Sequence, residues 1–158
     1  KAAEKVTKSL FEDLQTEILT EVSAALMKFS ESFGVRNLQS MTLNGAGHLK
    51  IEQGGQTTSF TKLNSGENLR VRIAAALAVL EVAERRGHGR HPGLIVLDSP
   101  AAQEMSHQDF AALVESVVAA ADEFPDVQIV VGAVNRQELL SHVPRERRRH
   151  AEGDNPLF

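Results

Sequence analysis

Hydrophobic residues recur every three or four positions over residues 1 to about 33, which predicts one long amphipathic helix. The opposite face of this segment is mostly acidic. Two interpretations fit: a helix packed on a sheet, or the root of a coiled coil leading away from a domain. The pattern is too short to decide between them. The predicted apolar face consists of Phe11, Leu14, Ile18, Val22, Leu26, Phe29 and Phe33.

The pattern then changes to short β-prone runs separated by strong turn signals. Leu38–Leu43 and His48–Glu52 alternate loosely on either side of Asn-Gly-Ala-Gly at positions 44–47. A Gly-Gly pair at 54–55 precedes a third β-prone run, Thr57–Thr61. This segment is therefore predicted to form a small antiparallel meander of two or three strands.

A polar turn opens directly into the most apolar helix of the chain, over Leu63–Leu80. The helix is predicted to run from Gly66 or Glu67 to about Arg86, where the Gly-His-Gly sequence at 87–89 ends it. Because its apolar residues lie on nearly every side, it is expected to be buried. Its first turn has unpaired backbone N–H groups, which suit an anion such as a phosphate.

The C-terminal part of the chain predicts a strand, a helix and a second strand. Leu94–Leu97 is a continuous apolar run, typical of a strand covered on both faces. A helix is predicted over Gln108–Glu123 and a second strand over Val127–Val131. This order and spacing indicate a βαβ unit with parallel strands. A further short helix is predicted over Asn135–His142.

Composition adds limits to this picture. The 158 residues amount to one domain, and 42% hydrophobic and 24% charged residues are typical of a soluble protein. The chain has no cysteine and no apolar run long enough to span a membrane, so we expect a cytoplasmic protein without disulfides or membrane contact. The first residue is Lys1, not methionine, which suggests a piece of something longer.

A net charge of −4 gives no overall electrostatic case for nucleic acid, but one basic cluster lies near the C-terminus. It fits either a solvated tail or a salt-sensitive contact with the DNA backbone. No tryptophan or tyrosine is present to stack on bases. The cluster consists of Arg145, Arg147, Arg148 and Arg149.

Two strings in this order, LNSGENLR from Leu63 and GLIVLDSP from Gly93, resemble the signature motif and Walker B strand of ABC-type ATPases of the SMC, RecF and SbcC kind. The resemblance covers roughly residues 10 to 140 and implies the C-terminal lobe of an ATPase head. The expected fold is α/β, a mostly parallel sheet with flanking helices, a small antiparallel meander and a long N-terminal helix. The expected division is 1–33 for the helix, 34–144 for the lobe and 145–158 for a basic tail.

In that family ATP and Mg²⁺ are held between two heads. Leu63, Gly66 and Glu67 agree with the family signature LSGGE, while Asn64 replaces its serine and Ser65 its first glycine. The resemblance implies that Asn64, Ser65, Gly66 and Glu67 bind nucleotide held by a second head. It also implies that Asp98 holds Mg²⁺ through water. The alternative role for Asp98 is a turn residue at a strand end.

Several family residues are missing. Ser99 stands where the catalytic glutamate is expected, and a serine is no general base without an activating partner. Glu104 or Gln103 could replace that glutamate. The aspartate of the next loop falls near Met105 and the switch histidine near Ala133, so both are absent.

No Walker A sequence occurs in the chain, so a partner lobe carrying it is expected, on another chain or in a missing segment. With that lobe, the predicted function is ATP-gated head dimerisation and ATP hydrolysis, coupled to DNA repair, chromosome handling or defence. One alternative is a non-hydrolysing scaffold with a degenerate nucleotide site. Another is an unrelated α/β fold that matches by chance.

Overall fold

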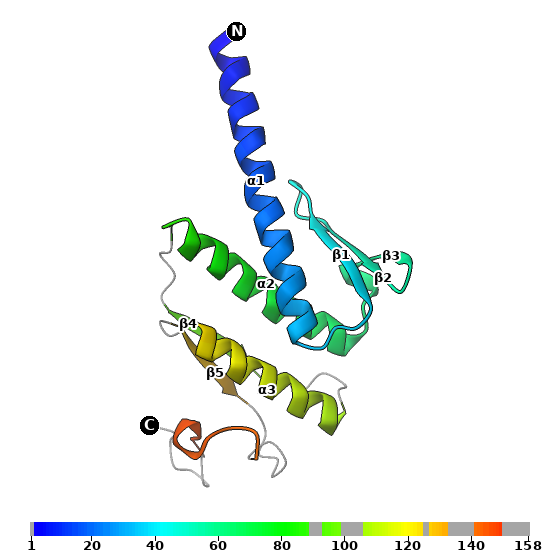
Figure 1. The fold of residues 1–158 in the computed structure, drawn as a ribbon, viewed down its shortest axis with the longest axis vertical. Coiled ribbons are helices and arrows are strands. Elements are labelled where there is room, and N and C mark those ends of the chain that lie inside the picture. Colours follow the sequence, from blue (N-terminus) through cyan, green and yellow to red (C-terminus); the bar gives the residue numbers. More distant parts are fainter. Residues whose placement is uncertain (1, 89–92, 99–105, 125–126, 133–140, 150–158) are drawn as a thin grey trace. The chain divides into compact units, whose positions relative to one another are not determined.

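The computed structural model describes residues 2–88, 93–98, 106–124, 127–132 and 141–149. The chain divides into two compact units, Lys1–His91 and Pro92–Phe158. The first contains α1 (Ala2–Ser32), β1 (Leu38–Leu43), β2 (Leu49–Gln53), β3 (Gln56–Ser59), η1 (Phe60–Lys62) and α2 (Ser65–Arg85). The second contains β4 (Leu94–Asp98), α3 (His107–Glu123), β5 (Gln128–Gly132) and η3 (Arg145–Arg147) (Figure 1).

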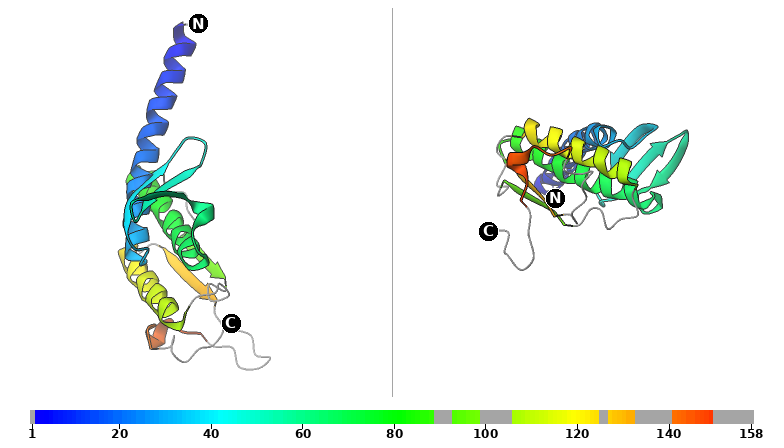
Figure 2. Two further views of the ribbon diagram at one scale, coloured as in Figure 1. Left: turned by 90° about the vertical axis from the view of Figure 1, so that its right-hand side faces the viewer. Right: turned by 90° about the horizontal axis from the view of Figure 1, so that it is seen from below.

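The core of the first unit lies between α1 and α2. Val22, Leu26 and Phe29 of α1 are buried, as is Phe33 just beyond it, and they share the core with α2 residues such as Leu77. The predicted apolar face of the N-terminal helix is thus confirmed for its C-terminal half. Its N-terminal half extends beyond the meander (Figure 2). The apolar side chains of this half are exposed. These exposed residues are Val6, Leu10, Phe11 and Leu14.

Helix α2 follows the prediction from its polar turn to its glycine stop. Gly87 has a φ of 70°, a left-handed conformation that glycine adopts without the cost of a Cβ. The helix is largely buried, as expected, although Val79 is 56% exposed. The helix packs against α1, and the exposed residues in its middle form a narrow stripe that contains Val79.

The meander forms a three-stranded antiparallel sheet in the order β1-β2-β3, as predicted. At the first turn the Asn44 side-chain oxygen accepts hydrogen bonds from the amides of Ala46 and His48. This local bonding closes the hairpin at the predicted Asn-Gly position. Met41 and Ile51 point into the core from β1 and β2 and are almost fully buried.

One buried hydroxyl joins the outer edge of this sheet to α1. The Ser23 hydroxyl accepts a hydrogen bond of 2.9 Å from the Leu43 amide, and it donates to the Leu19 carbonyl. Ser23 is only 8% exposed, so its loss leaves the Leu43 amide without its acceptor in a poorly solvated place. We expect Ser23→Ala to lower the free energy of unfolding by about 1–2 kcal/mol, measured by urea denaturation.

Thr16 is the matched control for Ser23. It lies on the same helix and is exposed, and its hydroxyl donates to the Glu12 carbonyl of that helix. Thr16→Ala is expected to change stability by less than about 0.5 kcal/mol. Equal effects of the two substitutions would show that the bond between sheet and helix contributes nothing of its own.

Ion pairs fasten the C-terminal end of α2 to the middle of α1. The Arg86 guanidinium contacts both Glu17 and Glu21 at 2.6 Å, and Arg85 contacts Glu21 at 2.8 Å. Hydrogen bonds from Arg86, and then from Arg85, lower the pKa of Glu21 below its usual range, against the opposing effect of burial. We name Glu17, Glu21, Arg85 and Arg86 the helix clasp.

The direction of this pKa shift fixes how the clasp depends on pH. A carboxylate with a lowered pKa in the folded protein contributes stability above its unfolded pKa, and this contribution is lost as the pH falls. Arg86→Met should therefore lower Tm by roughly 2–4 °C at neutral pH and low salt, and the difference should shrink as the pH falls below the usual range of a glutamate pKa. Lys8→Met, which removes an exposed pair with Glu12 on the same helix, should shift Tm by less than about 1 °C. A pH-independent effect of Arg86→Met would contradict the clasp.

The second unit is a βαβ unit, as predicted. Strands β4 and β5 are parallel, with Val96 opposite Val130 and Asp98 opposite Gly132. Ser106 is the N-cap of helix α3, and its hydroxyl accepts from the Asp109 amide. The helix buries one face. That face contains Phe110, Leu113, Val117 and Ala120.

Two expectations about the sheets were wrong. The described strands do not form one mostly parallel sheet: three are antiparallel in one sheet, and only β4 and β5 are parallel, in another. The reason is that tight turns join the first three strands, whereas a single βαβ unit yields a single parallel pair. Strand β4 is also not covered on both faces, because Leu94 and Val96 are 44% and 61% exposed.

The remaining sequence expectations concern the ends of the elements and the membrane. The short helix expected over Asn135–His142 falls mostly outside the described residues, and the last two of its residues form a turn. Within the described parts of the chain, no helix has the length and apolar character needed to cross a bilayer.

Candidate nucleotide site

The polar turn predicted to bind nucleotide forms the first turn of α2. Asn64 is the N-cap, and its side-chain oxygen accepts a 2.9 Å hydrogen bond from the Glu67 amide. The Asn64 carbonyl accepts from the Asn68 amide. Among the described residues, no acceptor pairs with the amides of Ser65 and Gly66, the two amides that lie between these bonds. The turn therefore presents two backbone donors at a helix N-terminus, where the helix dipole favours an anion.

The Glu67 carboxylate is held from both sides. Asn64 donates to its Oε2 from the side-chain amide at 2.8 Å, and Gln53 donates to its Oε1 at 2.8 Å. The same Gln53 amide nitrogen also donates to the Arg36 carbonyl at 2.9 Å. Both donors of the Gln53 side chain are thus occupied, and they join the end of β2 to the turn.

Contacts between η1 and α2 also hold the turn in place. The Asn68 side-chain amide donates to the Phe60 carbonyl at 3.2 Å. One turn further along α2, the Arg72 guanidinium lies 5.6 Å from the centre of the Phe60 ring, a cation–π contact. The segment that leads into the turn is therefore packed along the first two turns of the helix that follows.

The structure thus brings the four predicted signature residues together, but they do not present the same chemistry. Ser65 and Gly66 offer amide donors, and Ser65 adds an exposed hydroxyl. Asn64 uses its oxygen and one amide hydrogen within the turn, which leaves one hydrogen for a ligand. Glu67 offers only acceptors, and both of its oxygens are engaged. Its predicted contact with nucleotide stays a prediction.

Asp98 is the last residue of β4, at the carboxyl edge of the parallel pair, and it is exposed. A Cβ added at Gly132, its partner on β5, would lie 3.7 Å from the Asp98 Oδ1, so the carboxylate lies close to the Gly132 backbone. Ligands of open α/β sheets bind at this edge. The position fits the predicted Mg²⁺ role, which stays a prediction.

Within the part of the chain that the structure describes, Asp98 has few protein ligands near it with which to share a Mg²⁺ ion. The described residues contain no group of three or more His, Asp or Glu side chains that could hold a metal ion by themselves. A single carboxylate nevertheless fits Mg²⁺ at a nucleotide, because that ion keeps several waters and takes its other ligands from phosphates. Asp98 would hold the ion, and the ion would supply charge neutralisation at the phosphates.

The residues predicted to replace the missing catalytic base lie outside the described residues. This holds for Glu104 and Gln103, and for the departures at Ser99, Met105 and Ala133. Their roles stay predictions.

The predicted DNA-contacting arginines are mostly engaged within the chain. Arg147 pairs with Asp122 at 3.0 Å, and Arg148 donates to the Val143 carbonyl at 2.7 Å. Arg149 donates to the carbonyls of Glu146 and Arg148. A phosphate contact would therefore replace existing bonds at these three arginines, and the predicted DNA contact stays untested.

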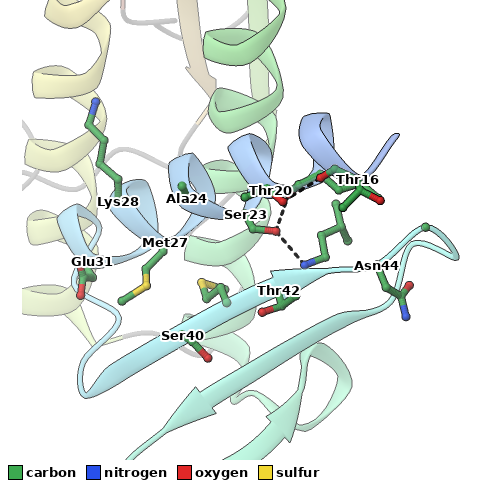
Figure 3. A pocket seen from close by; sticks show the side chains of 14 residues that line it. Thr16, Thr20, Ser23, Ala24, Met27, Lys28, Glu31, Ser40, Thr42 and Asn44 are labelled. Carbon is green, nitrogen blue, oxygen red and sulfur yellow. Dashed lines mark hydrogen bonds between the residues drawn. The ribbon is translucent and has the colours of Figure 1, made fainter. Parts of the chain in front are cut away.

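A groove of about 770 Å³ lies elsewhere in the first unit, between α1 and β1 (Figure 3). Thr16, Thr20 and Ser23 of α1 face Ser40 and Thr42 of β1, and Met27 adds an apolar surface. Its lining is mostly apolar and hydroxylic, with one lysine and one glutamate near one end, Lys28 and Glu31. This lining lacks the converging N–H donors of a phosphate site, so we do not assign nucleotide to the groove.

Sequence reasoning missed Gln53, which lies 14 positions before Glu67 in the chain. No local pattern marks it, because a glutamine at the end of a strand, just before a turn, is an ordinary residue. Only the packing of β2 against the start of α2 makes it part of the turn.

Comparison with known proteins gives a likeness of fold. No protein-family model matches the sequence, and no curated protein matches it. Solved structures do match at low identity. One, from work on ATP-driven dimerization and DNA-stimulated activation of SMC ATPases, has a TM-score of 0.59 at 13% identity, over 84% of this chain and 78% of that one.

Two further solved structures, both SMC head domains, show the same likeness of fold. An Smc head domain with a coiled coil and joint from Pyrococcus yayanosii has a TM-score of 0.59 at 13% identity, over 88% of this chain. The SMC head domain from Thermotoga maritima has a TM-score of 0.51 at 13% identity, over 83%. The chain spans 25% and 44% of these two proteins. Its α/β fold is therefore that of part of an SMC head.

Proposed function

We propose that this chain is the C-terminal lobe of an SMC-like ATPase head that dimerises with a second head around ATP. The amides of Ser65 and Gly66, with Ser65 and Asn64 side-chain donors beside them, would bind the γ-phosphate of nucleotide held by the second head. Asp98 would hold Mg²⁺ at the nucleotide of its own head. The observation that carries this proposal is the first turn of α2, where the two amides after the Asn64 cap have no acceptor among the described residues.

The exposed face of the β4–β5 pair supports a missing partner lobe. Leu94, Val96 and Val130 lie on one face and are 44%, 61% and 43% exposed. Parallel sheets are normally covered on both faces and have more than two strands. A Walker A lobe, on the same gene product or another, would supply the remaining strands and cover.

The projecting half of α1 supports a coiled-coil root. Val6, Leu10 and Leu14 lie four residues apart, so they form one stripe, and all are about half exposed or more. A second helix along this stripe would remove them from water. In the proposed head, this helix pair would carry nucleotide-dependent movement toward the DNA-directed work of repair, chromosome handling or defence.

The test is the mass of the full-length gene product, with the Walker A chain added if it is encoded separately. We expect light scattering to show a dimer with Mg-ATP and a monomer without it, and phosphate release to accompany the dimer. A dimer without turnover would favour the non-hydrolysing scaffold, in which Ser99 accounts for the missing chemistry. No response of mass or phosphate release to nucleotide would refute the ATPase-head proposal.

A further inference from the structure

We infer that Gln53 is a positioning residue that keeps the Glu67 carboxylate away from the phosphate-binding amides of Ser65 and Gly66. The inference rests on the proposed function, because it assigns a role to a residue outside the signature string. It starts from one geometric fact: Gln53 donates to the Arg36 carbonyl and to Glu67 Oε1 with the same amide group.

The turn holds a potential conflict of charge. Glu67 carries a carboxylate in the first turn of α2, within the region where the helix dipole attracts anions. A γ-phosphate would occupy the same region and carries the same sign of charge. An unrestrained carboxylate at the third position of a helix commonly turns back toward the start of the helix to accept from backbone amides. Glu67 could thus compete with the phosphate.

The hydrogen bonds of the turn resolve this conflict. Gln53 holds one carboxylate oxygen of Glu67 toward the end of β2, and Asn64 holds the other. Gln53 is itself fixed, because its second amide hydrogen is bound to Arg36 and its backbone pairs with Leu38 of β1 and Gln56 of β3. The sheet therefore sets the position of Glu67, and the amides of Ser65 and Gly66 stay open to a ligand.

Removal of Gln53 should weaken the response to nucleotide without changing the fold. For Gln53→Leu in the full-length gene product, we expect the ATP concentration for half-maximal dimer formation to rise about tenfold, since a charge-assisted hydrogen bond is lost. Gln56→Leu is the matched control, because it removes the same amide from the exposed cross-strand neighbour. It should leave the ATP response unchanged.

A double substitution separates positioning from simple support of the fold. If Glu67 competes with the phosphate once Gln53 is gone, then Gln53→Leu combined with Glu67→Gln should restore most of the ATP response, because the competing charge is removed. A merely structural role predicts that the double variant is as weak as the single one or weaker. Hydrogen exchange of the peptide 63–70 without nucleotide should be faster in Gln53→Leu, which reports the lost bond independently of ATP.

The outcomes distinguish this inference from the proposed function. A wild-type protein that dimerises with ATP, together with a Gln53→Leu variant of unchanged response, would overturn the inference alone. The absence of restoration in the double variant would also overturn it. A wild-type protein that ignores ATP would overturn both. If Gln53→Leu does not fold, Gln53→Asn is the substitute, because it keeps the amide but is one methylene shorter. It should raise the ATP concentration for half-maximal dimer formation by a smaller factor.

Discussion

Asp98→Ala is expected to abolish ATP turnover by the complete head, with a loss of at least about a hundredfold in the rate of phosphate release. The carboxylate lies at the carboxyl edge of the β4–β5 pair, where it would orient the waters around Mg²⁺. Without it, the ion would lose its fixed position and with it the ability to stabilise charge on the phosphates. The measurement is single-turnover phosphate release from the full-length gene product with saturating Mg-ATP.

The fold should survive this substitution, because Asp98 is exposed at the end of its strand. Asp122→Asn is a suitable control, since it alters another exposed carboxylate of the same unit. Asp122 lies near the C-terminal end of α3 and pairs with Arg147. Its turnover should stay within about twofold of wild type. Normal turnover by Asp98→Ala would remove Asp98 from the metal site. A wild-type protein without any turnover would instead favour the scaffold.

Gly66→Glu is expected to separate stability from function. Gly66 is the second residue of α2, with ordinary helical φ, so a longer side chain introduces no backbone strain there. A residue other than glycine favours the helix, and a carboxylate in its first turn complements the dipole. Thermal stability should therefore be unchanged or slightly raised. The same carboxylate would repel a γ-phosphate and cover the open amides, so ATP-dependent dimer formation should weaken by about a hundredfold or more.

Helix α3 offers a control at the equivalent position. Gln108 is the second residue of α3, two after the N-cap Ser106, as Gly66 is two after Asn64. Gln108→Glu adds the same charge in the same local geometry and should leave the ATP response within about twofold of wild type. If both substitutions reduce dimer formation equally, added negative charge alone is the cause, and the first turn of α2 loses its assigned role.

The element order of this protein was set by local sequence. The Asn-Gly and Gly-Gly turns force neighbouring strands into antiparallel pairs, and the spacing of Leu94–Asp98, α3 and β5 requires a parallel crossover. The start of α2 at Ser65 after an Asn64 cap and its end before Gly87 were likewise predictable, because caps act within a few residues. These features depend on contacts between residues close in the chain.

Burial was predicted less well, because it depends on what lies opposite each face. Phe11 and Leu26 belong to one apolar stripe of α1, yet Leu26 is buried against the core and Phe11 is 65% exposed. In the same way, the apolar run of β4 predicted a strand covered on both faces, whereas Val96 is exposed. Hydrophobic pattern shows which faces avoid water, and it does not show which partner covers them.

The candidate site also combines features set by local sequence with features set by tertiary packing. The sequence alone determined the string Asn64–Glu67 at a helix start and the carboxylate of Asp98 at a strand end, since both positions follow from local pattern. Only the tertiary structure decided that Glu67 is held by Gln53 and that α1 is fastened to α2 by Arg86. These bonds join residues 14 and 65 positions apart. Pairing at that separation follows from how the sheet and helices pack, which no local spacing encodes.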